Sequence, residues 1–202
     1  ELLFKYLKLP ISTQLRKKND LIKVTGEKKI KPFNYLIPSD ISSCTFFIVL
    51  TALSNKSKLK IKNVNINPSR TGAIKILRSM GVKIIFNNVK NYKGEKIGDI
   101  YVKSTKIIRA INCPSSLNSS SIDEFLVIFL AAAKAKGVSY FKNLSELNQK
   151  ESPRLKWGSK ILSLMGIKTI TTNNSIKIFG NPALNLDKKK IIIKDFLKDH
   201  RV

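Results

Sequence analysis

The residues with the clearest chemical potential lie in one short segment, Lys150-Glu151-Ser152-Pro153-Arg154, which combines two cations and one anion. An apolar-periodic run from Leu155 to Met165 follows it. Ser is a preferred N-cap and Pro suits the first helical position, so the segment predicts a helix that begins at Ser152. Backbone N–H groups and the dipole at a helix start favour bound anions. A solvated helix start with ordinary surface charges is the alternative interpretation.

The helix that would carry this segment belongs to an internal repeat. Residues 76–83 (ILRSMGVK) recur 85 positions later as residues 161–168 (ILSLMGIK). The helix predicted to start at Asp40 recurs 83 positions later at Asp123, and residues 4–9 resemble a third copy of the same helix end. A period of about 80 residues is too long for a solenoid. The repeat predicts an α/β (α+β) fold assembled from copies of one βαβαββ unit.

Apolar periodicity, together with the positions of Gly and Pro, predicts the individual elements. Residues 123–136 are apolar on nearly every face, which predicts a buried helix. Residues 87–98 are polar and predict a turn region, and the break at residues 37–40 predicts a domain boundary. The expected helices are 1–9, 40–54, 67–80, 123–136 and 152–165, and the expected strands are 11–15, 21–25, 59–64, 82–86, 99–104, 138–144, 167–171, 176–179 and 190–193.

Each copy of the repeat places an arginine in the first turn of its second predicted helix, Arg70 in one copy and Arg154 in the other. A cation at this end opposes the helix dipole. The placement is reasonable if an anion binds between the helix start and the guanidinium, or if the arginine pairs with a nearby carboxylate. For Arg70 we expect the pairing role.

The net charge of +25 comes from 38 basic and 13 acidic residues, and suggests nucleic acid as a partner. Lys far outnumbers Arg, however, and AT-rich codons can raise the lysine count without selection for binding. The lysines are also dispersed, with no basic stripe interleaved with aromatic residues. We therefore expect a solvated basic surface and no nucleic-acid partner. Such a surface would still attract a small polyanionic substrate.

Metal and membrane signals are absent from the sequence. Cys44 and Cys113 lie 69 residues apart, neither has a metal-ligand neighbour, and the one histidine is His200. We expect buried, reduced thiols and no metal site. No apolar run reaches the roughly 18 residues of a membrane span. We expect a cytoplasmic protein that does not bind membranes, and a fragment of a longer chain, because the sequence does not begin with Met.

Four segments together resemble the 5-enolpyruvylshikimate-3-phosphate (EPSP) synthase family. Residues 67–72 (NPSRTG) resemble its NPxRTG segment, and residues 122–125 (IDEF) its IDE-type helix start. Residues 150–155 (KESPRL) resemble its KES-D-RL signature, and residues 199–201 its DHR motif. Four motifs in the right order are far more specific than any one of them. The similarity runs along the whole chain, which corresponds to about half of a full-length enzyme of this family.

The resemblance implies an inverse α/β barrel of two domains, each made of three βαβαββ units, with helix N-termini facing a cleft. Residues 1–37 would end the first, shikimate-side domain, and residues 38–202 would form most of the second. The implied reaction transfers the enolpyruvyl group of phosphoenolpyruvate to the 5-hydroxyl of shikimate 3-phosphate, which yields EPSP and phosphate in aromatic amino acid biosynthesis. It requires a base, proton transfer at the enol carbon and cations, but no cofactor or metal. The full enzyme would be a monomer.

The resemblance also implies roles for individual residues on the shikimate side. Asp123 would accept the proton of the substrate hydroxyl and contact shikimate 3-phosphate, and a plain helix N-cap is its alternative or additional role. Lys150 would bind shikimate 3-phosphate and help to neutralise developing charge.

The remaining implied roles concern phosphoenolpyruvate. Glu151 would contact it and take part in proton transfer to the enolpyruvyl carbon. Arg154 and Arg201 would clamp it, because a guanidinium fork suits carboxylates and phosphates. His200 would be a catalytic neighbour, with a structural role as the alternative.

The chain departs from the family pattern at Pro153, where Asp is usual, at Ser39, where Gly is usual, and at Leu126, where Pro is common. The family's N-terminal Lys-Ser pair, glycine-rich loop, Ser-Ser-Gln segment and final Lys have no counterpart here, so the fragment is expected to be inactive. Three alternatives remain open. They are a UDP-N-acetylglucosamine enolpyruvyl transferase, a basic nucleic-acid-binding module and a non-catalytic remnant.

Overall fold

The computed structural model describes residues 1–14, 20–26, 29–185, 192–193 and 198–202. Its helices are α1 (Leu2–Tyr6), α2 (Ile41–Leu53), α3 (Gly72–Ser79), α4 (Phe125–Ala133) and α5 (Arg154–Leu164). Its strands are β1 (Ile11–Gln14), β2 (Leu21–Val24), β3 (Lys58–Asn65), β4 (Ile84–Tyr92), β5 (Glu95–Lys103), β6 (Gly137–Phe141), β7 (Thr169–Thr171) and β8 (Ile176–Gly180). Short 3₁₀ turns are η1 (Pro68–Arg70), η2 (Ser115–Leu117), η3 (Ser119–Ser121) and η4 (Ser145–Gln149).

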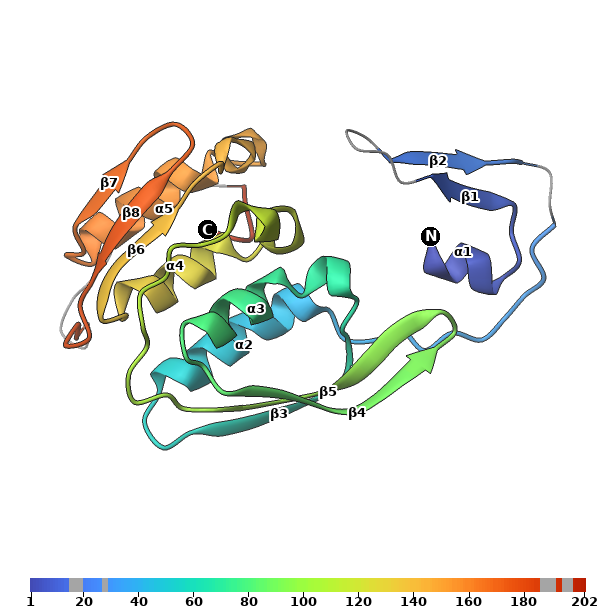
Figure 1. Ribbon diagram of the computed structural model, residues 1–202, viewed down its shortest axis with the longest axis horizontal. Helices are drawn as coiled ribbons and strands as arrows, with labels where there is room; N and C mark the ends of the chain where they lie inside the picture. Colours follow the sequence, from blue (N-terminus) through green and yellow to red (C-terminus); the bar gives the residue numbers. More distant parts are fainter. Residues whose placement is uncertain (15–19, 27–28, 186–191, 194–197) are drawn as a thin grey trace.

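The predicted βαβαββ repeat is present twice. The first copy forms the antiparallel sheet β3-β5-β4 and the second the sheet β6-β8-β7, in the same strand order. A short parallel bridge precedes the first helix of each copy, at Ser39 with Val64 and at Asn112 with Tyr140. Figure 1 shows the two sheets on the outside and α2, α3, α4 and α5 between them. The helices therefore form the interior, and their N-termini can face a common site.

The core follows from this arrangement. Helix α4 packs against α2, α3 and α5, and seven of its nine residues are buried, as its uniformly apolar sequence predicts. Gly158 allows α5 to approach closely, because a Cβ there would lie 2.9 Å from Leu126 Cδ2 and 3.0 Å from Phe129 Cδ2. Across the sandwiched layer, Phe125, Phe129 and Phe141 pack ring to ring at centroid distances of 5.2 to 6.0 Å.

The prediction of a polar turn at residues 87–98 is wrong, because these residues form most of the long β4–β5 hairpin. The register pairs Tyr92 with Glu95, so the loop has only Lys93 and Gly94, with φ of 49° and 88°. Two positive φ values are the geometry of a type I′ hairpin turn. Most of β4 beyond Phe86 is exposed, so polar side chains suit both of its faces and conceal the strand from apolar patterning.

The predicted helix starts also need correction. Residues 67–80 form η1 and then α3, not one helix, because Asn67 Oδ1 caps the N–H of Ser69 and the tight turn ends at Thr71. Helix α5 begins at Arg154 after Pro153, and the Ser152 side chain does not cap it. Helix α4 begins at Phe125 after Glu124, so Asp123 is not its N-cap. In contrast, α2 begins beside Asp40, where the sequence places the helix start, and Asp40 caps it by accepting the Ser43 N–H at 2.8 Å.

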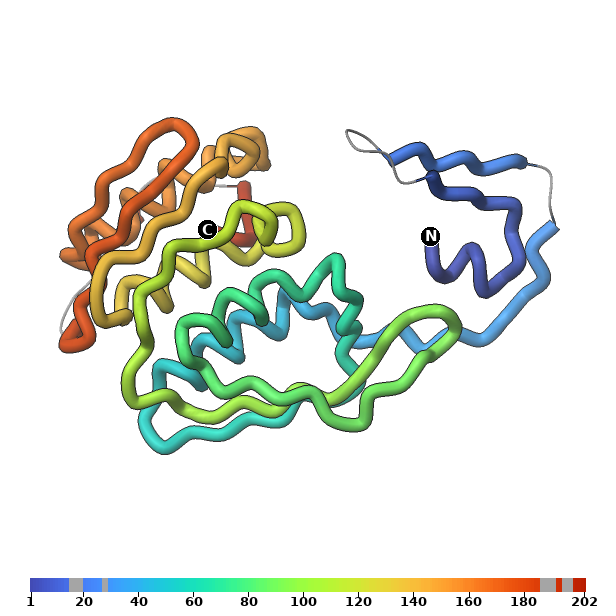
Figure 2. Tube along the Cα trace, viewed as in Figure 1, coloured from blue at the N-terminus to red at the C-terminus, as the bar shows by residue number. Residues whose placement is uncertain are grey.

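Residues 1–37 contribute α1 and the β1–β2 hairpin, which confirms the predicted helix and strand pair. Figures 1 and 2 show this part lying apart from the two-copy body, joined to it by an extended segment. This part contacts the β4–β5 turn, where Leu36 N–H donates to the Tyr92 hydroxyl at 3.0 Å. The domain boundary near residue 37 stays a prediction. The strand predicted at 190–193 lies largely outside the described residues.

Within the described part of the chain, no helix combines the length and the apolar character that crossing a bilayer requires.

Candidate active site

The candidate site forms where the starts of α2, η1, α4 and α5 meet the end of the chain. Arg154 lies at its centre, and its side chain is only 3% exposed. Its Nε donates to Asp199 Oδ2 at 2.9 Å and its Nη2 to Asp199 Oδ1 at 3.3 Å. Its Nη1 donates to Asp123 Oδ1 at 3.1 Å, and its Nη2 also donates to Glu151. We call these four residues the Arg154 cluster.

The cluster resolves the electrostatic problem of a buried guanidinium. Burial alone would lower the pKa of Arg154, but the hydrogen bonds and charge of Asp199, with Glu151 and Asp123, raise it above its ordinary value. A buried cation without such partners would be strongly destabilising. The arginine that opposes the dipole of α5 is therefore held by carboxylates, as the pairing interpretation of the repeat predicts.

Asp199 anchors the other side of the cluster with a fully buried side chain. The Ser152 hydroxyl donates to its Oδ2 at 2.8 Å, and the Arg201 backbone N–H donates to its Oδ1 at 3.0 Å. Burial would raise the pKa of Asp199, but Arg154 and these two donors lower it to about 2. The Ser152 hydroxyl, predicted to cap α5, is therefore used to tie the end of the chain to the helix start.

A second set of contacts reaches Asp123 from the first copy of the repeat. Arg70 Nη1 lies 3.7 Å from Asp123 Oδ2, and Arg70 Nη2 donates to the Ser42 hydroxyl at 2.8 Å. That hydroxyl donates in turn to the buried carboxylate of Glu124. Burial raises the pKa of Glu124, which the Ser42 hydrogen bond and the Arg70 charge partly oppose. Asp123 therefore has a guanidinium beside each of its oxygens, one from each copy.

The structure brings three of the predicted site residues together, namely Asp123, Glu151 and Arg154. Lys150 lies at the edge, with its ammonium 3.6 Å from Glu146 Oε1. The backbone N–H of Arg201 joins the cluster, and the charge of Arg201 acts on Glu124. The residue also lines a small apolar groove of about 210 Å³ between α4 and α5. His200 is exposed, and among the described residues no hydrogen bond or ion pair joins its side chain to the cluster.

The sequence predicts no role for Ser42 or Glu124, only a helix cap at Ser152, and Asp199 only as part of a motif. One signal was available for Asp199. It opens the Asp199-His200-Arg201 motif, so it is the direct neighbour of residues that the sequence places at the site. Ser42 and Glu124 carry no such signal, because their pairing joins α2 to α4 across 82 residues.

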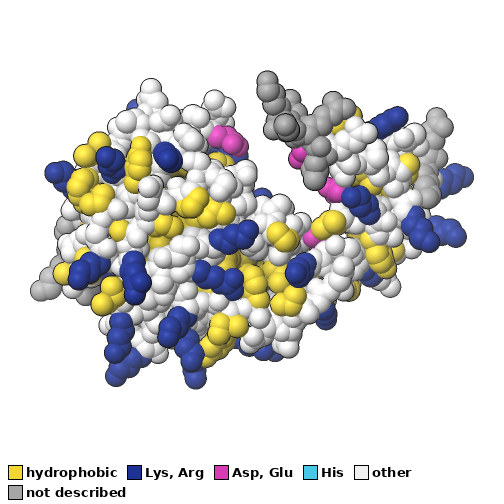
Figure 3. Space-filling model, viewed as in Figure 1, with side chains coloured by type: hydrophobic (Ala, Val, Ile, Leu, Met, Phe, Trp, Pro, Cys, Tyr) yellow, Lys and Arg dark blue, Asp and Glu magenta, His cyan; other side chains and the backbone are white. Residues whose placement is uncertain are grey.

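The basic residues do not gather at one visible patch. Figure 3 shows Lys and Arg side chains scattered over the face in view, with a few acidic side chains beside the space between the two-copy body and the N-terminal part. This distribution matches the dispersed basic surface expected from the sequence.

Comparison with known proteins gives consistent matches along the chain. The sequence model of EPSP synthase (3-phosphoshikimate 1-carboxyvinyltransferase) matches residues 3–202. The 3-phosphoshikimate 1-carboxyvinyltransferase of Ruthia magnifica is 37% identical over 88% of this chain and 40% of the relative, and that of Geobacillus kaustophilus is 35% identical over 90% and 42%. The chain thus spans about 40% of the length of these relatives.

Solved structures agree with the sequence matches. An EPSP synthase from Acinetobacter baumannii has a TM-score of 0.80 and 34% identity, over 88% of this chain and 39% of that one. An enolpyruvyl transferase of Streptomyces tendae, at 16% identity and a TM-score of 0.59, shares the fold over 85% of this chain and 37% of that one.

Proposed function

The chain belongs to the EPSP synthase family, and on that premise we propose that it supplies the phosphoenolpyruvate-binding half of an EPSP synthase site. The whole protein would transfer the enolpyruvyl group of phosphoenolpyruvate to the 5-hydroxyl of shikimate 3-phosphate and release phosphate. The observation that carries the proposal is the Arg154 cluster, in which one buried guanidinium lies between a candidate base and a candidate proton donor.

The hydrogen-bond donors of the Arg154 guanidinium are suited to a carboxylate ligand. A guanidinium has five N–H donors, and four are engaged here, two of them by Asp199. The edge formed by Nη1 and Nη2 is the one that a substrate carboxylate would take as a fork. Glu151 holds part of that edge, and its side chain is 53% exposed, so it is the partner most easily displaced. In the proposed reaction the substrate carboxylate replaces Glu151, which is then free to handle the proton at the enolpyruvyl carbon.

Asp123 is the proposed base. Its Oδ1 is held by Arg154 and its Oδ2 lies near Arg70, so both oxygens are oriented by fixed groups. A base oriented in this way needs no reorganisation when it accepts the proton of the 5-hydroxyl. The adjacent guanidinium groups would also stabilise the negative charge that develops on the substrate.

The remaining assignments are part of the proposal. Lys150 would exchange Glu146 for shikimate 3-phosphate, because an ion pair with an exposed glutamate is weak. Arg201 would turn its guanidinium towards phosphoenolpyruvate while its backbone stays bonded to Asp199. His200 would lie beside the substrates. We further propose that residues 1–37 end one domain and residues 38–202 belong to the other, in a monomeric cytoplasmic enzyme.

The test is a chimera in which residues 3–202 replace the matching segment of the Acinetobacter baumannii EPSP synthase. Phosphate release is measured with phosphoenolpyruvate and shikimate 3-phosphate, and separately with UDP-N-acetylglucosamine as acceptor. We expect release only with the first pair. Release only with the nucleotide sugar would overturn the substrate assignment in favour of the other enolpyruvyl transferase class.

Arg154→Lys keeps a cation beside Asp199 but removes the fork, so the chimera should stay folded and lose at least about 100-fold in kcat/KM, the loss of two charge-assisted hydrogen bonds. Arg109→Lys, at an exposed arginine of the second copy, is the matched control and should change kcat/KM by less than twofold. Thermal unfolding of both variants separates lost activity from lost structure. Equal activity in the two folded variants would show that the Arg154 fork does not bind substrate.

A further inference from the structure

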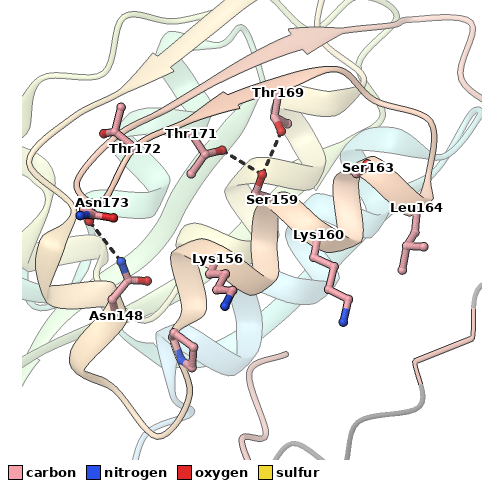
Figure 4. A pocket seen from close by; sticks show the side chains of 11 residues that line it. Asn148, Lys156, Ser159, Lys160, Ser163, Leu164, Thr169, Thr171, Thr172 and Asn173 are labelled. Carbon is pink, nitrogen blue, oxygen red and sulfur yellow. Dashed lines mark hydrogen bonds between the residues drawn. The ribbon is translucent and has the colours of Figure 1, made fainter.

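A groove of about 690 Å³ lies between the outer side of α5 and strand β7, outside the Arg154 cluster. Most of the residues that line it are polar, and Pro153 and Leu164 are the apolar ones. Figure 4 shows hydroxyls of Ser159, Thr169 and Thr171 meeting between helix and strand, with Asn148 and Asn173 at one end and Lys156 and Lys160 along one side. Pro153 also lines it, whereas its neighbours Ser152 and Arg154 are buried on the cluster side. The groove and the cluster therefore use different faces of the same helix.

The repeat supplies an internal comparison for this groove. The ends of α3 and α5 have matching backbone bonds, from Gly81 N–H to Arg78 O at 2.9 Å and from Gly166 N–H to Ser163 O at 2.8 Å. The next bonds also match, from Val82 N–H to Leu77 O and from Ile167 N–H to Leu162 O, at 3.0 and 2.9 Å. Positions 85 residues apart are therefore structurally equivalent here.

In the first copy the equivalent crevice is filled by its own side chains. Arg78 Nε donates to the Ile84 carbonyl at 3.0 Å, and its guanidinium lies 4.6 Å from the ring centroid of Phe86. In the second copy the residues equivalent to Arg78, Ile84 and Phe86 are Ser163, Thr169 and Thr171.

The buried Ile74 of the first copy is likewise replaced, by Ser159. The same scaffold is closed and partly apolar in one copy but open and lined with hydroxyls in the other. The difference between the two copies therefore lies in the side chains at equivalent positions.

The three hydroxyls are joined by hydrogen bonds and can form further ones. Thr171 Oγ1 donates to Ser159 Oγ at 2.8 Å, and Ser159 Oγ and Thr169 Oγ1 are 2.9 Å apart. Each hydroxyl offers one donor and two acceptor lone pairs, so the set can exchange further hydrogen bonds with ligand hydroxyls.

At the end of the groove, Asn148 Nδ2 donates to the Asn173 carbonyl at 3.1 Å. Among the described residues its Oδ1 is buried without a partner. An acceptor left in this way costs free energy, so a ligand donor that reached it would be favoured.

The charges at the rim are of one sign. Lys156 and Lys160 both line the groove, and among the described lining residues there is no carboxylate. The Lys160 ammonium also lies 4.3 Å from the Trp157 ring centroid. Hydroxyl and amide groups in the floor recognise a polyol, and ammonium groups at the rim recognise a phosphoryl group.

We propose that the α5–β7 groove is a second binding site, for a phosphorylated polyol of monosaccharide size. The phosphoryl group contacts Lys156 and Lys160, and the ring hydroxyls replace or extend the Ser159, Thr169 and Thr171 hydrogen bonds. This site is separate from the proposed transfer reaction and does not depend on it.

The test is a titration of the 202-residue chain with glucose 6-phosphate, followed by the backbone amide signals of the protein. We expect saturable shifts at residues 159, 163, 169 and 171. Sorbitol lacks the phosphoryl group and inorganic phosphate lacks the polyol hydroxyls. Each should bind at least about tenfold more weakly than glucose 6-phosphate, since one charge-assisted contact or its equivalent is lost. Shifts confined to the Arg154 cluster, or equal affinity for inorganic phosphate, would overturn the proposal.

A variant that fills the groove and a variant that removes a lysine from its rim test the proposed contacts. Ser163→Arg with Thr171→Phe restores the stacked pair of the first copy, so it should fill the groove, keep the fold and abolish the shifts. Lys160→Ala should weaken binding about tenfold, whereas Lys75→Ala, at the equivalent position of α3, should change it by less than twofold. Unchanged binding in the filled variant would show that the ligand binds elsewhere.

Discussion

Replacing Asp199 by Asn tests whether the Arg154 cluster stabilises the fold through charge. The side chain of Asp199 is fully buried and accepts hydrogen bonds from Arg154 and Ser152. Asn keeps the size of the side chain but removes its charge, and its amide N–H groups would face the donors of the guanidinium. We expect the variant to be less stable at neutral pH.

The magnitude follows from the pKa of Asp199. Burial acts to raise it, but Arg154 and the two other donors lower it from 3.8 to about 2. A shift of this size corresponds to about 2 kcal/mol of stability at neutral pH. The Asp199 side chain is fully buried, so we expect a loss of about this size in the variant. Arg154 keeps Asp123 and Glu151, so the variant does not leave a buried cation unpaired.

The lowered pKa of Asp199 determines how the loss of stability should change with pH. A carboxyl whose pKa is depressed by folding contributes stability above its unfolded value, and this contribution is lost as the pH falls through the folded value. The loss of stability in Asp199→Asn should therefore be largest at pH 7 and should decrease between pH 4 and about 2. Urea unfolding at pH 7, 5 and 3, followed by circular dichroism, measures it.

Asp20→Asn, at an exposed aspartate, is the control and should show no deficit at any of these values. If the Asp199 variant were as stable as the parent at pH 7, or kept its full deficit at pH 3, the charge argument would be wrong.

Three further predictions concern packing, a buried acid and the thiols. Gly180→Ala would place a Cβ 2.1 Å from a backbone carbonyl oxygen, so thermal unfolding should show a loss of about 2–3 kcal/mol. Gly26→Ala, with no atom within 4 Å, should not differ from the parent, and equal losses would contradict the packing. Burial raises the pKa of Glu124, and stability from such a group is lost as the pH rises, so Glu124→Gln should gain stability relative to the parent between pH 4 and pH 7 in urea unfolding. A gain that is larger at pH 4 would contradict this. Burial raises the pKa of the Cys44 and Cys113 thiols to about 11, so iodoacetamide at pH 8 should label them only after unfolding in urea, and rapid labelling of the native protein would refute their burial.

Local pattern was sufficient for most elements of the repeat. Helices α2 and α4 and the β7–β8 hairpin could be predicted because apolar spacing and short turns are properties of neighbouring residues. The polar stretch at 87–98 could not, since a hairpin that is exposed on both faces has no apolar alternation to reveal it. Pattern methods detect burial, and they fail where a strand is stabilised mainly by backbone pairing.

Some features of the candidate site could likewise be predicted from the sequence, and others could not. The charges of residues 150–154 and their place at a helix start are properties of the sequence, and so is the repeat that relates Arg70 to Arg154. The hydrogen bond from Ser152 to Asp199, which replaces the predicted helix cap, could not be read from the sequence. A hydroxyl bonds to whichever partner the fold brings nearest, and this partner lies 47 residues away.

The chain itself determined which charged groups this protein carries and which helix starts present them. Only the tertiary structure decided how they pair. Asp123 became the bridge between the two copies instead of a cap, and Ser42 and Glu124 paired with each other across 82 residues. The physical reason is that burial makes each unpaired charge costly. The packing of α2, α4 and α5 therefore selects partners by distance in space, which local sequence does not encode.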